Sequence, residues 1–112
     1  MICSSWLSVS VDIEGEATVI SVRGEIDLRS APQFQRCLLE IARRTDKPLV
    51  VDLTKTSFLD CRGLATLAAT RDALQAHGQM LYLHGAQGIV RRILTLSDLV
   101  DLLEEPPVEG ER

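Results

Sequence analysis

Long hydrophobic runs are missing from this sequence. The longest contain only a handful of residues, such as Leu49-Val50-Val51, whereas a membrane-spanning helix needs about 20 apolar residues. The first residues of the chain contain neither a basic region nor a long apolar stretch, so they match neither a secretory signal nor a lipoprotein signal. We therefore expect no membrane span and a cytoplasmic location.

Positive charge is also scarce. The 112 residues include 12 Lys and Arg against 16 Asp and Glu, so the formal net charge is −4 at pH 7. Much of the acidic excess lies in residues 104–112, which contain four glutamates and one arginine. A protein that binds nucleic acid needs a clustered positive field, so direct binding to nucleic acid is not expected.

The sequence has few cysteines and none of the common catalytic motifs. Cys3, Cys37 and Cys61 are widely spaced, with no C-x-x-C or Cys/His pairing, which argues against a disulfide framework and a zinc site. The chain also has no G-x-G-x-x-G after a strand, no Walker loop, no H-E-x-x-H and no G-x-S-x-G. We therefore expect free thiols, no metal, no cofactor and no enzymatic activity.

The content of the chain indicates one ordinary globular domain. Its length allows a single domain, and 46% hydrophobic residues supply a core. In residues 7–14, apolar and polar side chains alternate as in an edge strand with one wet face. Gly15 supplies a turn into a second strand over residues 17–23, which predicts an antiparallel hairpin.

Helices and buried strands follow the hairpin. Ser30 and Gln33 form a capping box in which the Ser30 hydroxyl caps the helix. One apolar stripe of that helix faces the sheet: Phe34, Cys37, Leu38, Ile41 and Ala42. Residues 49–53 are typical of a strand covered on both faces. The pattern continues with a second helix that ends at Gly78 and a buried strand at residues 80–83. It closes with a third helix, whose apolar stripe includes Ile89, and a last short helix or strand at residues 99–103.

The order β-β-α-β-α-β-α predicts a small α/β fold. The parallel core of its mixed sheet is extended by the N-terminal antiparallel hairpin, and helices pack against the sheet. We expect the domain to span residues 1–104 and a flexible acidic tail to occupy residues 105–112.

The most informative stretch is residues 51–64, which we interpret as a buried strand, a polar loop and the start of a helix. This loop opens at the carboxyl end of a parallel strand, where ligands and partners usually bind. Asp60 is suited to cap the helix, because its carboxylate accepts backbone N–H groups and meets the positive end of the helix dipole.

The chain resembles the STAS domain of bacterial anti-sigma factor antagonists over about residues 7–103. The residues V-R-G-E-I-D at 22–27 look like the family's G-E-[LI]-D, and L-V-V-D-L at 49–53 like its central strand. The residues F-L-D-C-R-G-L at 58–64 line up with F-[LMI]-D-S-S-G-L. Residues 78–80 and V-R-R-I-L at 90–94 resemble the closing segment of the family.

The resemblance implies a partner-switching protein. The unphosphorylated form of such a protein binds an anti-sigma factor of the serine-kinase type and frees a sigma factor, and phosphorylation of a serine releases it, because added charge destabilises the interface. The partner-binding and switch residues implied here are Asp27, Ser57, Asp60, Cys61, Arg62, Gly63 and Leu64. The family's phosphoacceptor position is occupied by Arg62, which has no hydroxyl.

This departure leaves several hypotheses open. Regulation is either lost, which makes the protein permanently competent to bind, or moved to Thr54, Thr56 or Ser57. Arg62 either meets an acidic partner surface or is merely compensated by Asp60. Cys61 is either a redox sensor or a small buried replacement for serine.

Other functional classes remain possible. One alternative is a STAS subunit or scaffold of a larger complex, such as a lipid-transport ATPase or a stress-signalling assembly. Another is a small-ligand or nucleotide sensor that uses either the turn at residues 85–88 or the switch loop. Both a monomer and a weak dimer stay open.

Overall fold

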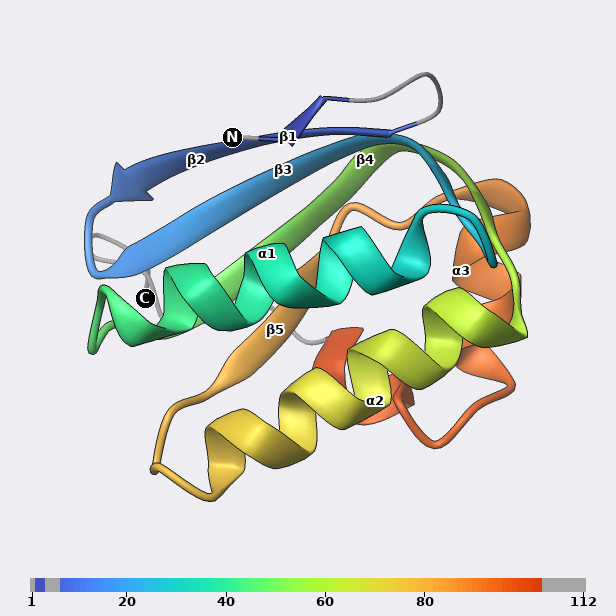
Figure 1. The fold of residues 1–112 in the computed structure, drawn as a ribbon. Helices are drawn as coiled ribbons and strands as arrows, with labels where there is room; N and C mark the ends of the chain where they lie inside the picture. Colours follow the sequence, from blue (N-terminus) through green and yellow to red (C-terminus); the bar gives the residue numbers. More distant parts are fainter. Residues whose placement is uncertain (1, 4–6, 104–112) are drawn as a thin grey trace.

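A single five-stranded sheet, in the spatial order β1-β2-β3-β4-β5, organises the computed structural model, which describes residues 2–3 and 7–103 (Figure 1). The strands are β1 (Ile2–Cys3), β2 (Leu7–Glu14), β3 (Ala17–Ile26), β4 (Leu49–Leu59) and β5 (Leu81–His84). The helices are α1 (Ala31–Arg43), α2 (Cys61–Gln75), α3 (Gly88–Thr95) and the 3-10 helix η1 (Val100–Leu103).

The sheet mixes both strand directions. β1 and β3 both pair with β2 in the antiparallel sense, whereas β4 pairs with β3 and β5 in the parallel sense. This confirms the predicted α/β class and the order β-β-α-β-α-β-α. The short β1 precedes that order and pairs with β2 at residues 8 and 9, so the prediction that β2 is an edge strand was wrong at this end.

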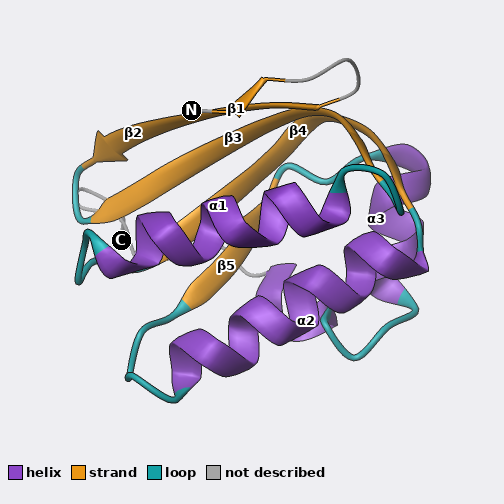
Figure 2. Ribbon diagram, in the orientation of Figure 1, coloured by secondary structure: helices purple, strands orange, loops and turns teal. Residues whose placement is uncertain are grey.

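Helices α1 and α2 cover one face of the sheet and lie side by side across it (Figures 1 and 2). The predicted stripe of α1 is confirmed: Phe34, Cys37, Leu38 and Ala42 are buried, and Ile41 is partly buried against the same core. Burial raises the pKa of the Cys37 thiol. α3 contacts β4 and adds Val90 and Leu94 to the core.

The largest correction to the sequence analysis concerns β4. The segment interpreted as a polar loop after residue 53 is strand, and β4 continues to Leu59 in parallel pairing with β3. The first part of β4 is buried on both faces as predicted, but Thr54, Lys55, Ser57 and Phe58 are exposed. Pairing with β3 supplies the hydrogen bonds that hold this polar segment extended.

Several local predictions also fail. The Ser30 side chain does not cap α1; its hydroxyl donates to the Glu25 carbonyl oxygen at 2.7 Å instead. Val11, Ile13, Met80 and Ile89 are exposed rather than buried. Val11 and Ile13 are exposed because the second half of β2, residues 11–14, is exposed on both faces of the sheet.

The structure describes the chain up to residue 103, so it tests only the first of the two C-terminal predictions. Residues 99–103 end in the 3-10 helix η1, which settles the choice between helix and strand. The predicted acidic tail at residues 105–112 lies outside the described residues. No helix in the described part of the chain is both long enough and apolar enough to cross a bilayer.

Candidate functional site

The predicted switch residues gather at one end of the sheet. β3 and β4 are parallel neighbours, so their carboxyl ends lie side by side, and each leads into a helix: β3 into α1 and β4 into α2. The backbone N–H of Asp60 donates to the carbonyl oxygen of Ile26 at 3.3 Å. The loop that contains Asp27 and the first turn of α2 therefore lie next to each other at the edge where parallel sheets usually receive partners.

Asp60 caps α2 as predicted. Its Oδ1 atom accepts hydrogen bonds from the backbone N–H groups of Arg62 at 2.9 Å and Gly63 at 3.0 Å. The side chains of Cys61 and Arg62 are both exposed in the first turn. A cation there opposes the helix dipole by about 0.3–1 kcal/mol, and the Asp60 carboxylate offsets that effect. Arg62 forms no ion pair with another described residue, so its charge faces solvent.

Gly63 is required by close packing. A Cβ atom added at this position would lie 2.7 Å from the Ile26 carbonyl oxygen and 2.5 Å from Leu59 Cδ1. These distances are shorter than any that a real side chain adopts, so α2 can lie against the end of β3 only through a glycine. Leu64, the next residue, is half-buried and packs against the core.

Asp27 organises the loop between β3 and α1. Its carboxylate accepts from the Arg29 guanidinium, at 2.6 Å to Oδ2, and from the Arg29 backbone N–H, at 2.9 Å to Oδ1. Ser30 Oγ accepts from the Asp27 N–H at 3.1 Å. The pKa of Asp27 is lowered, chiefly by the hydrogen bond from the Arg29 side chain; burial opposes this shift, and backbone N–H groups add to it.

Because Asp27 is buried and bound by Arg29, this loop presents other residues to a partner. Leu28 is 61% exposed, and the Arg29 side chain, which also bonds Glu25, is 54% exposed. Neither residue was predicted from the sequence to belong to the site. Leu28 could have been noticed as an apolar residue in a polar segment that belongs to no strand or helix stripe. The hydrogen bonds from Arg29 to Asp27 and Glu25 depend on the folded shape of the loop, so they could not be predicted from the sequence.

A hollow of about 300 Å³ lies next to this loop, between α1 and α2. Small and apolar side chains make up most of its wall, to which Arg62 also contributes. The lining residues are Leu28, Ala31, Pro32, Gln35, Arg62, Ala65, Thr66 and Ala69. The exposed first turn of α2 and the shallow groove between the helices thus form one surface, which we call the switch surface.

The three hydroxyl residues predicted as alternative phosphoacceptors lie on β4 and differ in access. Thr56 is buried and donates to the Val22 carbonyl oxygen at 2.9 Å, so a kinase cannot reach it in the folded chain. Ser57 is exposed and donates to the Gly24 carbonyl oxygen at 3.2 Å. Thr54 is exposed and donates to Asp52 Oδ1.

Two further predictions concern Cys61 and the turn at residues 85–88. The Cys61 thiol is free and exposed, so it is not a small buried replacement for serine. Gly85 packs so closely on Thr54 that a Cβ would collide with its hydroxyl, which closes that side of the turn to a ligand. Within the described residues, no three His, Cys, Asp or Glu gather as a metal site.

Comparisons with known proteins agree with the motifs. The family model for the STAS domain matches residues 8–110. The anti-sigma-B factor antagonist of Listeria monocytogenes is 30% identical over 108 residues, which cover 94% of this chain and 95% of that protein.

Solved structures of anti-sigma factor antagonists are similar to this chain as well. An anti-sigma factor antagonist from Mycobacterium paratuberculosis is 31% identical with a TM-score of 0.74, over 85% of this chain and 80% of that one. The antagonist SpoIIAA in its unphosphorylated form has a TM-score of 0.72 at 18% identity, over 85% and 84% of the two chains; at that identity the match concerns the fold.

Proposed function

Since the chain belongs to the STAS domain family, we propose that it acts as an anti-sigma factor antagonist. In this proposal it binds an anti-sigma factor of the serine-kinase type through the switch surface and thereby releases a sigma factor. The protein acts by binding and catalyses no reaction. The relatives that support this function are antagonists by name.

One observation carries the proposal: the exposed Arg62 and the exposed Leu28 both line the hollow between α1 and α2. Protein interfaces combine an apolar centre with arginine and exclude most other charged residues from that centre. An anti-sigma factor seated here would bury Leu28 and contact Arg62. The hydrogen bond from Asp60 to Ile26 holds both halves of the surface together before a partner arrives.

We further propose that this antagonist is permanently competent to bind. The family's phosphoacceptor position holds Arg62, and Thr56 is buried. A phosphate adds about −1.5 to −2 charges, and no hydroxyl at residue 62 can accept one. Incubation with the anti-sigma kinase and ATP should leave the intact mass unchanged. A phosphate on Ser57 or Thr54 would instead show that regulation has moved along β4.

Binding to the anti-sigma factor tests the proposal. The partner is captured from the native cell, identified, purified and titrated against the wild type, Arg62→Glu and Arg44→Glu by calorimetry. Arg44 makes the same charge change possible at the far end of α1, away from the switch surface. An interface arginine contributes on the order of 1–2 kcal/mol, so Arg62→Glu should weaken binding by about five- to thirtyfold, and Arg44→Glu should not weaken it.

Two results would overturn the proposal. One is capture of a permease and an ATPase in place of an anti-sigma factor, which would favour a subunit of a larger assembly. The other is an anti-sigma factor whose affinity is unchanged by Arg62→Glu, because then the contact lies elsewhere on the molecule.

A further inference from the structure

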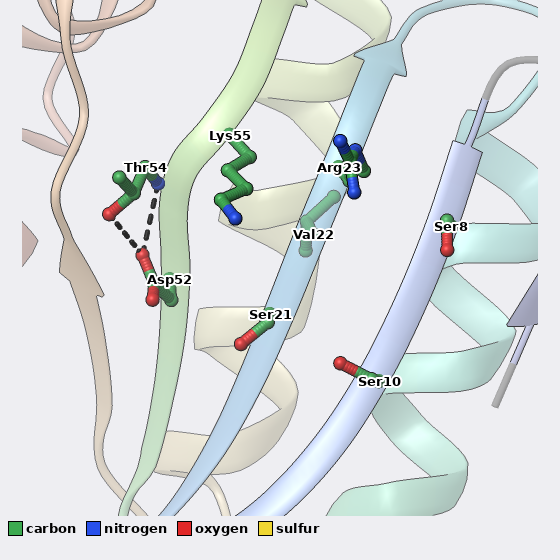
Figure 3. Close-up of a pocket in the computed structure, with 8 residues that line it drawn as sticks. All are labelled: Ser8, Ser10, Ser21, Val22, Arg23, Asp52, Thr54 and Lys55. Carbon is green, nitrogen blue, oxygen red and sulfur yellow. Dashed lines mark hydrogen bonds between the residues drawn. The ribbon is translucent and has the colours of Figure 1, made fainter.

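A second hollow, of about 400 Å³, lies on the face of the sheet opposite α1 and α2 (Figure 3). It crosses β2, β3 and β4 and is lined mainly by hydroxyl and charged side chains. The lining residues are Ser8, Ser10, Ser21, Val22, Arg23, Asp52, Thr54 and Lys55. In Figure 3, α1 and α2 lie behind the strands, so this hollow is separate from the switch surface.

A β-bulge arranges the charged residues of this hollow. Ser21 pairs with Asp52, but Arg23 pairs with Lys55, so two steps along β3 correspond to three along β4. The extra residue on β4 brings Lys55 beside Arg23, where a regular register would have placed Thr54. Bulges commonly redirect side chains next to functional sites.

The result is two adjacent cations without a counter-charge. Like charges on neighbouring strands repel each other. Within the described residues, the side chains of Arg23 and Lys55 form no ion pair or hydrogen bond, not even with Asp52. With Asp52 counted, the hollow carries a net charge of +1. An anion placed between Arg23 and Lys55 would relieve the repulsion, and the hollow is therefore complementary to a negatively charged group.

The second row of the hollow has a different chemistry. It consists of Ser10, Ser21 and Asp52, which pair across the three strands. Asp52 Oδ1 accepts from the Thr54 N–H at 3.0 Å and from its hydroxyl, whereas Oδ2 accepts no hydrogen bond from the described residues. This row lies about 7 Å along the strands from the cations, at roughly 3.3–3.4 Å per residue. It suits hydroxyl groups, which can donate to Asp52 and exchange hydrogen bonds with the serines.

We propose that this hollow binds a phosphorylated polyol, such as a sugar phosphate. The phosphate lies between Arg23 and Lys55, and hydroxyl groups of the polyol meet Asp52, Ser21 and Ser10. A phosphate monoester carries about −1.5 to −2 charges at pH 7, which matches the two cations. The volume falls within the range of small-molecule sites, about 300–1,000 Å³. Nothing in this inference depends on the proposed switch function.

Titration of the full chain with ribose 5-phosphate at low ionic strength tests the proposal, with amide chemical shifts as the readout. Saturable shifts are expected on β2, β3 and β4. Arg23→Gln and Lys55→Gln should each weaken binding at least about tenfold, the usual effect of removing one charge-assisted hydrogen bond. Arg36→Gln, which removes one exposed charge from α1, should leave the affinity unchanged.

Two further arms separate the ligand classes. Ribose without phosphate should not bind measurably. Asp52→Asn should weaken binding of ribose 5-phosphate while leaving or strengthening that of inorganic phosphate, because the carboxylate attracts hydroxyls and repels anions. The proposal is overturned if shifts map to α1 and α2, if Arg36→Gln is as harmful as Arg23→Gln, or if inorganic phosphate binds as tightly as ribose 5-phosphate.

Discussion

Replacing Gly63 with alanine tests the packing that builds the switch surface. In a helix, Gly→Ala ordinarily stabilises by up to about 1 kcal/mol. Here the new Cβ would lie 2.5 Å from Leu59 Cδ1, 2.7 Å from the Ile26 carbonyl oxygen and 2.8 Å from Ile26 Cγ2. Overpacking of this kind costs about 1–3 kcal/mol, and two of the three atoms belong to a residue whose backbone is held in β3.

The two effects have opposite signs, so the sign of the measured change decides between them. Subtracting a propensity gain of about 1 kcal/mol leaves a net destabilisation of up to about 2 kcal/mol. Urea unfolding with a slope of about 2 kcal/mol/M should then show a midpoint lower by up to about 1 M. The variant should also bind the anti-sigma factor more weakly, because α2 must move away from the end of β3.

Ala65→Gly provides the matched control. Ala65 is exposed two residues later in α2, and its replacement by glycine should cost about 1 kcal/mol through helix propensity alone. Both variants are therefore expected to lose stability, although they change the glycine content of α2 in opposite directions. An increase in the urea midpoint of Gly63→Ala would refute the argument that contact with Ile26 and Leu59 excludes a side chain.

Three further predictions concern single groups at the same end of the sheet. Asp60→Ala removes the two hydrogen bonds that cap α2, and we expect it to lower the free energy of unfolding by about 1 kcal/mol; an unchanged urea midpoint would contradict this. Asp27 has a folded-state pKa below its unfolded-state pKa, so the unfolded chain binds more protons and stability falls as the pH falls from about 4 through the lowered value. Asp27→Asn should remove this part of the acid sensitivity in unfolding curves measured from neutral to acidic pH, and an identical pH profile would speak against it. The Cys61 thiol should react with iodoacetamide in the folded protein, whereas Cys37 should react only after denaturation; equal labelling of the two cysteines in peptide maps of the folded protein would contradict this prediction.

Local patterns in the sequence were enough to predict most strands and helices, because each one carries its own periodicity. The stripe from Phe34 to Ala42 and the cap at Asp60 depend on residues three or four positions apart, and both are confirmed. The extent of β4 could not be predicted in this way. Residues 54–57 are polar, and only pairing with β3, about thirty residues earlier in the chain, keeps them extended.

In the candidate site too, features that depend on neighbouring residues could be predicted, and features that depend on the folded loop could not. Asp60, Cys61 and Arg62 could be placed at the helix start from the sequence, but the role of Asp27 could not. Its carboxylate is bound by Arg29 across a turn whose shape depends on the Ser30 hydroxyl reaching the Glu25 carbonyl oxygen. Ser30 was predicted to cap α1 because Ser30 and Gln33 have the residue types and spacing of a capping box. The folded chain uses its hydroxyl to close the loop instead.

The charge of the first turn of α2 restricts the kind of partner that fits the proposed function. Asp60 already accepts from the N–H groups of residues 62 and 63, so a phosphate at residue 62 would add its charge beside an existing carboxylate. With Arg62 the turn carries one negative and one positive group, and the negative one is directed toward the backbone. A partner approaching this turn therefore meets the guanidinium first. For an anti-sigma factor that binds this chain, complementarity requires an acidic surface opposite Arg62 and an apolar one opposite Leu28.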